Sequence, residues 1–263
     1  MAIEYGWCVD GGRRSANDDR VSVDGMLISG GTGGGAGDFP VLAAVCDGCG
    51  GYAGGGTAAE LVLQTLAQFR AEALLEPAAL AAALEKANRA IETRKAQDPA
   101  LAQMCSTVAG CVFGTHSLVV FHAGDSRVYR CDRIALARMT EDHSAVQELV
   151  SAGTITSEQA RQSPSRSVIT RCMGADSQPP EIRVSAETIL PGETYLLCSD
   201  GLWEAVSESR IREILSAQTT PEEKARLLVS EAWSGGSEDN ISALVCTVPG
   251  AAQAETERPF VLD

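Results

Sequence analysis

Residues 41–56 are Val-Leu-Ala-Ala-Val-Cys-Asp-Gly-Cys-Gly-Gly-Tyr-Ala-Gly-Gly-Gly. The prediction of the fold starts from this stretch. The apolar run Val41–Cys46 is shorter than a typical helix, so its length and composition predict a buried strand. The strand ends at Asp47 and brings that carboxylate to the edge of its sheet. The glycines that follow let the backbone turn sharply or approach a ligand closely, and a helical pattern begins at Thr57. Two interpretations remain open: a tight turn in which Asp47 bonds its own amides, or a ligand site.

The composition of the chain narrows the classes of function. Its 263 residues fit one large domain or two small ones, and a hydrophobic content of 44% is ordinary for a globular protein. There are 21 Lys and Arg residues against 35 Asp and Glu residues, a net charge of −14. A nucleic-acid-binding protein usually carries a basic patch, and no basic cluster stands out here. The acidic balance is typical of a soluble protein or of one that gathers cations.

The chain has nine cysteines, and several lie inside apolar, strand-like runs, as small buried hydrophobic residues do. This pattern predicts no disulfide framework and therefore a reducing compartment. Cys46 and Cys49 form a Cys-x-x-Cys motif, but no second such pair lies at zinc spacing, which disfavours a zinc or redox site. The N-terminus lacks the features of a signal peptide, and no apolar run reaches transmembrane length. We therefore expect a cytoplasmic protein without membrane contact.

The order of the elements predicts the fold class. The expected strands are Ile3–Val9, Val41–Cys46, Thr107–Gly114, Leu118–His122, Arg127–Arg130, Ile134–Arg138, Ile182–Val184, Thr194–Cys198 and Ile241–Val248, and Arg20–Ser29 is expected to be a strand or a hairpin. Helices are expected from Thr57, Pro77, Ser207 and Thr220, with weaker helical signals over Glu141–Pro164. Residues 30–37, rich in glycine, are expected to form a flexible connector at a hairpin tip. Because helices come in sequential pairs and strands in runs with short turns, we predict an α+β fold of mainly antiparallel sheets with helices packed outside.

Aspartates recur where the predicted strands begin or end. Asp200 follows an apolar strand and precedes a glycine, as Asp47 does, while Asp125 lies in a turn between two strands. Asp239 comes just before the last strand, and Asp18 and Asp19 come just before an early one. Each is explicable as turn chemistry alone. If the strands align, however, these carboxylates meet at one end of the sheets, where they require a counter-charge. Ligands that are all oxygen select hard cations, which indicates Mg²⁺ or Mn²⁺.

Six short motifs extend this observation over nearly the whole chain, from about Tyr5 to Val248. They are Arg14-x-x-Asn17-Asp-Asp19, Asp47-Gly-Cys-Gly-Gly51, Gly124-Asp-Ser-Arg127, Thr140-Glu-Asp-His-Ser144, Ser199-Asp-Gly-Leu-Trp203 and Asp239-Asn-Ile241. In this order and spacing, the chain resembles the PP2C-type metal-dependent protein serine/threonine phosphatases, in particular single-domain bacterial members. The resemblance implies an α-β-β-α sandwich of two antiparallel sheets flanked by helix pairs. It assigns residues 1–249 to the phosphatase domain and leaves 250–263 as a loosely ordered tail.

The resemblance also implies a role for each acidic residue. Asp47 would bridge two Mn²⁺ or Mg²⁺ ions, with the Gly48 carbonyl on one of them. Asp200 and Asp239 would complete the other, and Asp125 with Asp200 would bind a weaker third ion. Asp18 and Asp19 would hold water molecules bound to the metals.

Arg14 would bind the substrate phosphate with its planar set of donors. Two close divalent ions can activate water at neutral pH and stabilise an in-line displacement on phosphorus. The substrates that the resemblance implies are phosphorylated proteins, among them a serine/threonine protein kinase and its targets.

The chain departs from the family pattern at two positions. Many relatives carry Glu where this chain has Asp18, and a shorter arm still reaches a metal through water. Many carry His where this chain has Tyr52, a position often proposed to hold the general acid. A phenol has a pKa of about 10, which suits that task poorly. Thr140–Arg171 matches the flap of the family. Its segment Ser163–Arg171 would lie beside the site, and the arginines of that segment fit a solvated face and a substrate contact equally well.

Two other functions compete with this interpretation. Cys8 to Ser15 fits Cys-x₅-Arg-Ser, the phosphate loop of cysteine-dependent tyrosine phosphatases, in which a thiolate attacks phosphorus. That loop should lead from a strand into a helix, whereas here it leads into two aspartates and a strand. A catalytically weak pseudophosphatase or binding module is the other alternative. The complete acidic set disfavours it, and only the change at Tyr52 supports it.

Overall fold

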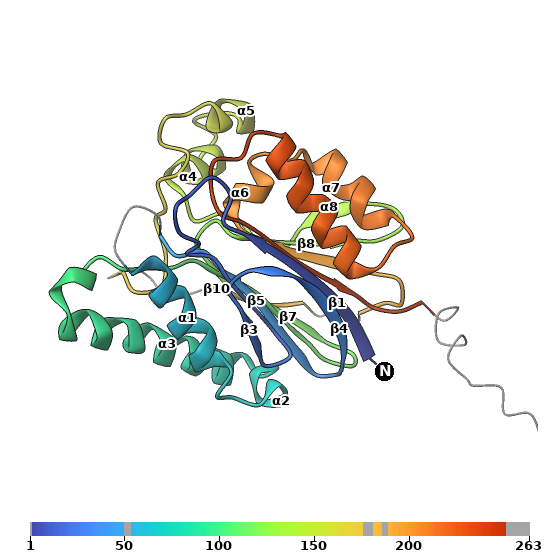
Figure 1. Ribbon diagram of the computed structural model, residues 1–263, viewed down its shortest axis with the longest axis horizontal. Helices are drawn as coiled ribbons and strands as arrows, with labels where there is room; N and C mark the ends of the chain where they lie inside the picture. Colours follow the sequence, from blue (N-terminus) through green and yellow to red (C-terminus); the bar gives the residue numbers. More distant parts are fainter. Residues whose placement is uncertain (1, 50–53, 176–180, 186–188, 251–263) are drawn as a thin grey trace, which may run out of the picture.

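The protein is an α-β-β-α sandwich, as predicted (Figure 1). The computed structural model describes residues 2–49, 54–175, 181–185 and 189–250. Tyr52 and all of the predicted tail except Gly250 lie outside these residues.

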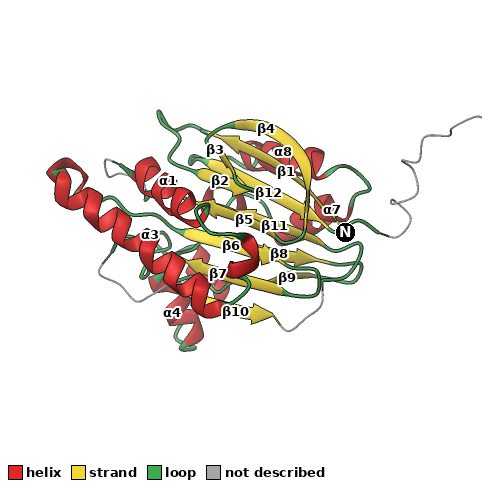
Figure 2. Ribbon diagram, turned by 90° about the horizontal axis from the view of Figure 1, so that it is seen from below, coloured by secondary structure: helices red, strands yellow, loops and turns green. Residues whose placement is uncertain are grey.

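Two six-stranded sheets form the centre of the sandwich (Figure 2). The first has the strand order β4 (Gly31–Asp38), β1 (Ala2–Asp10), β12 (Ile241–Thr247), β11 (Thr194–Cys198), β8 (Arg127–Cys131) and β9 (Leu136–Arg138). The second has the order β10 (Glu181–Ser185), β7 (Leu118–Ala123), β6 (Val108–Phe113), β5 (Val41–Cys46), β2 (Arg20–Val23) and β3 (Met26–Ile28). Every strand pair in the described part of the chain is antiparallel.

Helices cover the outer face of each sheet. The second sheet is covered by α1 (Gly55–Leu66) and α3 (Pro77–Gln97), which are joined by the short α2 (Ala71–Leu74), and a 3₁₀ turn (Pro99–Leu101) follows α3. The first sheet is covered by α7 (Glu208–Ser216) and α8 (Pro221–Ser234). Both of these begin at predicted positions because Ser207 and Thr220 accept hydrogen bonds from the third helical amide. The remaining helices are α4 (Ala145–Ser151), α5 (Ser157–Arg161) and α6 (Asp200–Trp203).

Strand β5 is apolar on both faces because the sandwich buries both. Ala43 and Val45 pack into the core between the sheets. Ala44 and Cys46 point the other way and pack against the helical layer. All four side chains are completely buried, which explains why this stretch is a continuous apolar run instead of an alternating one.

The glycine-rich segment is a strand and not the flexible connector that was predicted. Strand β4 pairs with β1 along its whole length and places Gly33 opposite Trp7 and Gly35 opposite Tyr5. A Cβ on Gly33 would collide with the Trp7 ring, and one on Gly35 would lie 3.0 Å from the Tyr5 ring. The glycines therefore leave room for the two aromatic side chains of the neighbouring strand. Sequence reasoning missed the strand because glycine has low strand propensity, while here the packing across the pair favours it.

Candidate metal and phosphate site

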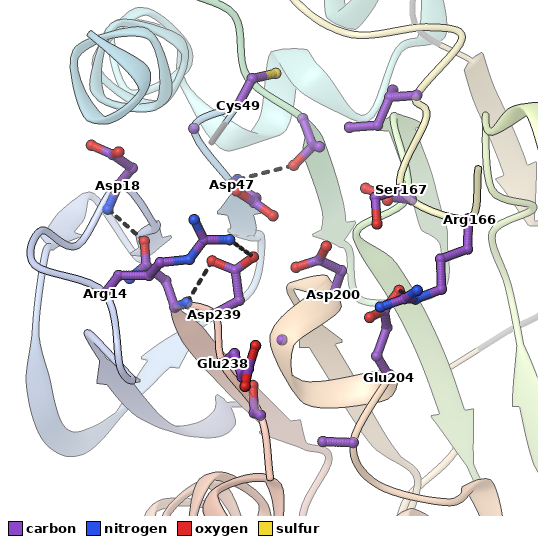
Figure 3. A pocket seen from close by; sticks show the side chains of 18 of the residues that line it. Arg14, Asp18, Asp47, Cys49, Arg166, Ser167, Asp200, Glu204, Glu238 and Asp239 are labelled. Atoms are coloured by element: carbon purple, nitrogen blue, oxygen red, sulfur yellow. Dashed lines mark hydrogen bonds and ion pairs between the residues drawn. The ribbon is translucent and has the colours of Figure 1, made fainter. Parts of the chain in front are cut away.

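One pocket of about 980 Å³ collects the predicted carboxylates at one edge of the sandwich (Figure 3). The aspartates that line it are Asp18, Asp47, Asp125, Asp200 and Asp239, and Arg14 lies at its side. They come from chain segments far apart in the sequence. Figure 3 shows Asp47, Asp200 and Asp239 directed toward a common space. The alignment of strand ends expected from the sequence therefore occurs.

The end of β5 holds Asp47 through its main chain. The Asp47 amide donates to Thr107 Oγ1 at 2.9 Å, and its carbonyl accepts from the Thr107 amide at 2.8 Å and from Ser106 Oγ at 3.0 Å. Gly48 follows where the chain passes the first turn of α1, and a Cβ there would collide with the backbone of Gly55. Only glycine fits this passage, and both Asp47 and Gly48 line the pocket.

Asp19 is completely buried and is not among the residues that line the pocket. Its Oδ2 accepts hydrogen bonds from the hydroxyls of Ser199 and Ser242, both at 2.7 Å. Burial raises the pKa of Asp19 to about 6, although the two hydroxyls oppose this shift. The two serines were not predicted as site residues. Ser199 opens a recognised motif without having been given a role, and Ser242 lies inside the last strand, where the sequence pattern shows only an ordinary small residue.

The carboxylates raise one another's pKa. Burial is the largest cause at Asp47 and Asp200, whose pKa values lie well above the ordinary range, and neighbouring aspartates add to it. Burial also raises the pKa of Asp125 to about 7, with a further contribution from Asp142. These pKa shifts arise because several carboxylates lie close together where little water solvates their charges.

Several buried carboxylate oxygens lack a donor. Within the described residues, no hydrogen bond reaches Oδ1 of Asp19, Asp125 or Asp200. A buried polar atom without a partner is costly, and a buried carboxylate is more so. Cations would satisfy these oxygens, and a donor set composed of carboxylates and one main-chain carbonyl fits hard divalent ions such as Mn²⁺ or Mg²⁺.

Asp18 has a position of its own. Its Oδ1 accepts from the Gly56 amide at 2.9 Å, so the carboxylate lies at the N-terminus of α1, where the helix dipole favours negative charge. In Figure 3 this carboxylate points away from Asp47, Asp200 and Asp239. Whether Asp18 holds a metal-bound water stays a prediction.

Arg14 lies beside the carboxylates and is accessible from solvent. Its Nη2 donates to Asp239 Oδ2 at 2.8 Å, and the two side chains are 49% and 39% exposed. Asn240 fixes the loop that carries Arg14: its Nδ2 donates to the carbonyls of Gly11 (2.8 Å) and Ala16 (2.9 Å). Its Oδ1 accepts from the Asp18 amide at 2.9 Å. The Asp-Asn-Ile motif was recognised in the sequence, but this role of Asn240 was not.

Contacts of Arg127 and Trp203 join three of the sequence motifs to one another. The Arg127 guanidinium lies 3.4 Å from the centroid of the Trp203 ring and donates twice to Asp142, at 2.6 and 2.9 Å. Trp203 Nε1 in turn donates to the Asp125 carbonyl at 2.9 Å. The motifs that contain Arg127, Asp142 and Trp203 therefore pack against one another, and those with Arg127 and Trp203 also supply carboxylates to the pocket.

The flap contributes one wall of the pocket. Arg166, Ser167 and Ile169 line it, and Arg166 lies 3.6 Å from Glu204 in an exposed ion pair. Of the two interpretations of the flap arginines, this position favours contact with a substrate for Arg166. Tyr52, the position of the expected general acid, lies outside the described residues.

The cysteines differ from the prediction. Cys49 is joined to Cys105 by a disulfide, with a sequence separation of 56, where no disulfide framework was expected. Its Cys-x-x-Cys partner Cys46 is completely buried in β5 and faces the helical layer. The bond was missed because the partner comes from a distant segment, and folding alone brings the two together.

Cys8 does not have the surroundings of a catalytic nucleophile. It is 7% exposed within β1, and Thr32 Oγ1 donates to its sulfur at 3.3 Å. Burial is the largest cause of its raised pKa, whereas a nucleophilic cysteine requires a lowered one. The Cys-x₅-Arg-Ser alternative therefore fits the structure poorly.

Known proteins share this sequence and architecture. A phosphatase of Listeria monocytogenes named serine/threonine phosphatase stp is 32% identical over 214 residues, covering 79% of this chain and 84% of that protein. The serine/threonine protein phosphatase PstP of Mycobacterium tuberculosis is 35% identical over 221 residues, covering 82% of this chain but 42% of its own length. This chain therefore spans less than half of that relative.

Solved structures give the same result. The crystal structure of the Mycobacterium tuberculosis phosphatase PstP/Ppp superposes with a TM-score of 0.82 at 32% identity and covers 95% of this chain and 100% of that one. The PstP catalytic domain in complex with two manganese ions has a TM-score of 0.79 with the same identity and coverage. The family model described as protein phosphatase 2C matches residues 32–233. Given this match, the shared sandwich and the clustered aspartates, the chain belongs to the protein phosphatase 2C family.

Proposed function

We propose that this chain hydrolyses phosphoserine and phosphothreonine in proteins, using a binuclear Mn²⁺ or Mg²⁺ site within residues 1–249. The observation that carries the proposal is the set of buried carboxylate oxygens without donors beside an accessible arginine. Such a pocket is costly to the protein unless it holds cations, and cations next to a guanidinium suit a phosphate ester. The manganese complex of the structural relative PstP supports the same conclusion.

The residues that would hold the ions are those that line the pocket. Asp47 and the Gly48 carbonyl, with Asp200 and Asp239, would bind the two ions, and Asp125 with Asp200 would bind a weaker third. Bound there, divalent ions would supply Lewis acidity toward the phosphoryl oxygens and an activated nucleophile.

The protein's own groups supply binding and orientation. Arg14 would hold the phosphate through charge-assisted hydrogen bonds, and the Asn240 side chain keeps the Arg14 loop in place. In the phosphatase, Arg14 would exchange its contact with Asp239 for contacts with the phosphate. Asp19, fixed by two serine hydroxyls, would orient water near the ions, as would Asp18.

The substrates follow from this chemistry and from the relatives. A pocket open to Arg14 and Arg166 suits a phosphorylated side chain on a protein surface, and we propose a serine/threonine protein kinase and its targets as partners, in the cytoplasm. None of the helices in the described part of the chain is both long and apolar enough to cross a bilayer.

Metal removal and restoration test the proposal. A phosphothreonine peptide is incubated with the full chain, first in EDTA and then with excess Mn²⁺ or Mg²⁺, while phosphate release is measured. Activity should disappear in EDTA and return with metal, and Asp200→Asn should remain inactive with metal although it is folded by circular dichroism. Full activity in EDTA would refute the binuclear mechanism. Tight Mn²⁺ binding without turnover of any phosphopeptide would instead indicate a metal-binding module.

A further inference from the structure

Three cysteines meet in the wall of the same pocket. The sulfur atoms of Cys49, Cys105 and Cys172 all lie within 4.8 Å of one another. Each comes from a different segment, and all three residues line the pocket. None of them takes part in the proposed phosphatase chemistry, so their convergence calls for a separate explanation.

Main-chain hydrogen bonds place these cysteines side by side. The Cys49 amide donates to the Cys105 carbonyl at 2.9 Å. One residue further on, Ser106 and Met173 exchange two hydrogen bonds, at 2.8 and 3.0 Å. Gly48 and Ser106 also form a bridge, so the three segments make a short antiparallel ladder. The ladder holds the three segments side by side through main-chain hydrogen bonds that are separate from the disulfide between Cys49 and Cys105.

The ligand atoms of this cluster differ in kind from those of the carboxylate site. Thiolates are soft ligands that select Zn²⁺ and related ions, whereas carboxylates and carbonyls suit Mn²⁺ and Mg²⁺. Three thiolates and one position open to the pocket make a tetrahedral set. Burial raises the pKa of the Cys172 thiol, and the nearby Lys95 ammonium opposes that shift and offers positive charge to a thiolate cluster.

The disulfide decides whether the cluster can act as a ligand set. While Cys49 and Cys105 are bonded to each other, the cluster cannot supply three thiolates. A dithiol reductant gives two electrons to the bond: it leaves as a cyclic disulfide, and Cys49 and Cys105 become thiols. The metal ion then displaces their protons and that of Cys172 into solvent.

We propose that Cys49, Cys105 and Cys172, once the disulfide is reduced, form a binding site for a thiophilic divalent cation such as Zn²⁺ or Cd²⁺, distinct from the carboxylate site. The two sites share a segment, because Ser106 and Thr107 also hold the main chain of Asp47. The cluster lies at the end of the flap, since Cys172 follows the last flap residue. An ion there would join the flap exit to the strand end that carries Asp47.

Cadmium titration of the full chain tests this site without relying on enzymatic activity. Cd²⁺ is added to reduced protein whose carboxylate site is kept saturated with Mn²⁺, and the ultraviolet thiolate-to-cadmium charge-transfer absorption is recorded. Carboxylate ligands do not produce this absorption. The reduced protein should bind one equivalent, and the oxidised protein should give no signal. The absence of a signal from reduced protein would overturn the proposal.

Single variants identify the ligands. Cys172→Ser should weaken Cd²⁺ binding by more than about tenfold. Loss of a residue that only hydrogen-bonds to a metal ligand already lowers metal affinity by about ten- to a hundredfold, and Cys172 would be a ligand itself. Cys8→Ser is the matched control and should bind as the parent does. Retention of parent affinity in Cys172→Ser, or an equal loss in Cys8→Ser, would refute the assignment.

Protection from alkylation provides a second measurement if a variant folds poorly. In the reduced parent, Cd²⁺ should slow iodoacetamide labelling of Cys49, Cys105 and Cys172, read by mass spectrometry of peptides. Labelling of all three at the same rate with and without Cd²⁺ would contradict the site. The outcome does not depend on phosphatase activity, so this proposal and the proposed function can fail independently.

Discussion

Replacing Arg14 by alanine separates substrate binding from metal binding. If the guanidinium holds the phosphate, its removal deletes a charge-assisted contact of about 1.5–3 kcal/mol, or roughly ten- to a hundredfold in binding. The loss should appear mainly as a higher KM, with a smaller fall in kcat, because the phosphate is held in both the ground state and the transition state.

The effect on the metal site should be much smaller. The Arg14 guanidinium is paired with Asp239, and the two side chains are 49% and 39% exposed. Exposed ion pairs contribute about 0–1 kcal/mol, or at most about fivefold in an equilibrium. Because Arg14 competes with metal for Asp239, its removal should leave Mn²⁺ affinity unchanged or slightly increased.

The assay measures phosphopeptide hydrolysis over a range of peptide concentrations at saturating Mn²⁺, and calorimetry measures Mn²⁺ affinity. Arg13→Ala is the matched control, since Arg13 lies 6.0 Å from the Trp233 ring centroid, and it should change little. Arg14→Lys should recover only part of the loss, because an ammonium cannot supply the planar set of donors. A large KM effect in Arg13→Ala with none in Arg14→Ala would show that the wrong arginine has been assigned. No effect in either would show that the metals alone hold the phosphate.

Three further predictions concern Asp47, pH and Cys8. Asp47→Asn should abolish Mn²⁺ binding and turnover together. It should also raise the Tm of the metal-free protein, because it removes a buried charge that the neighbouring aspartates repel. Unchanged Mn²⁺ binding in calorimetry would make Asp47 a turn residue only. Folding raises the pKa of Asp19 to about 6 and that of Asp125 to about 7, so these groups bind protons more tightly in the folded state. Metal-free protein should therefore lose stability as pH rises from about 4 to about 7. The increase in Tm caused by Mn²⁺ should be larger at about pH 7.5 than at about pH 5.5. Equal increases in Tm at the two pH values would argue against carboxylate ligation of Mn²⁺. Cys8→Ser should keep nearly full phosphatase activity, and a folded but inactive variant would revive the thiolate mechanism.

The sequence contained most of the information about the layers of this fold. The run Val41–Cys46 was short, apolar and followed by glycine, and burial on both faces of β5 is the physical reason for that pattern. The caps at Ser207 and Thr220 acted locally, so the starts of α7 and α8 could be predicted without any tertiary contact. Asp47 and Asp200 could be recognised as site residues because each directly follows a buried apolar strand. A charged side chain at that position contributes nothing to the packing of the core.

What could not be predicted depends on contacts between distant segments. Strand β4 has no apolar pattern, since its glycines make room for aromatic rings that belong to β1. The disulfide between Cys49 and Cys105 joins residues with a sequence separation of 56. The position of Asp18 at the start of α1 and the two serines that bond Asp19 likewise appear only when the segments are brought together.

The contacts of Asn240 have a consequence for the order of events during synthesis. Asn240 bonds the Asp18 amide across 222 positions of the chain, and the strand that follows it, β12, inserts between β1 and β11. The loop that carries Arg14 leaves the ribosome early but gains its side-chain supports only when the last strand has been made. A nascent chain arrested before Asp239 would have β1 and the Arg14 loop but neither the last carboxylate nor the amide that fixes that loop. We expect such fragments to be silent toward phosphoproteins, so that the activity becomes available only after β12 has been synthesised.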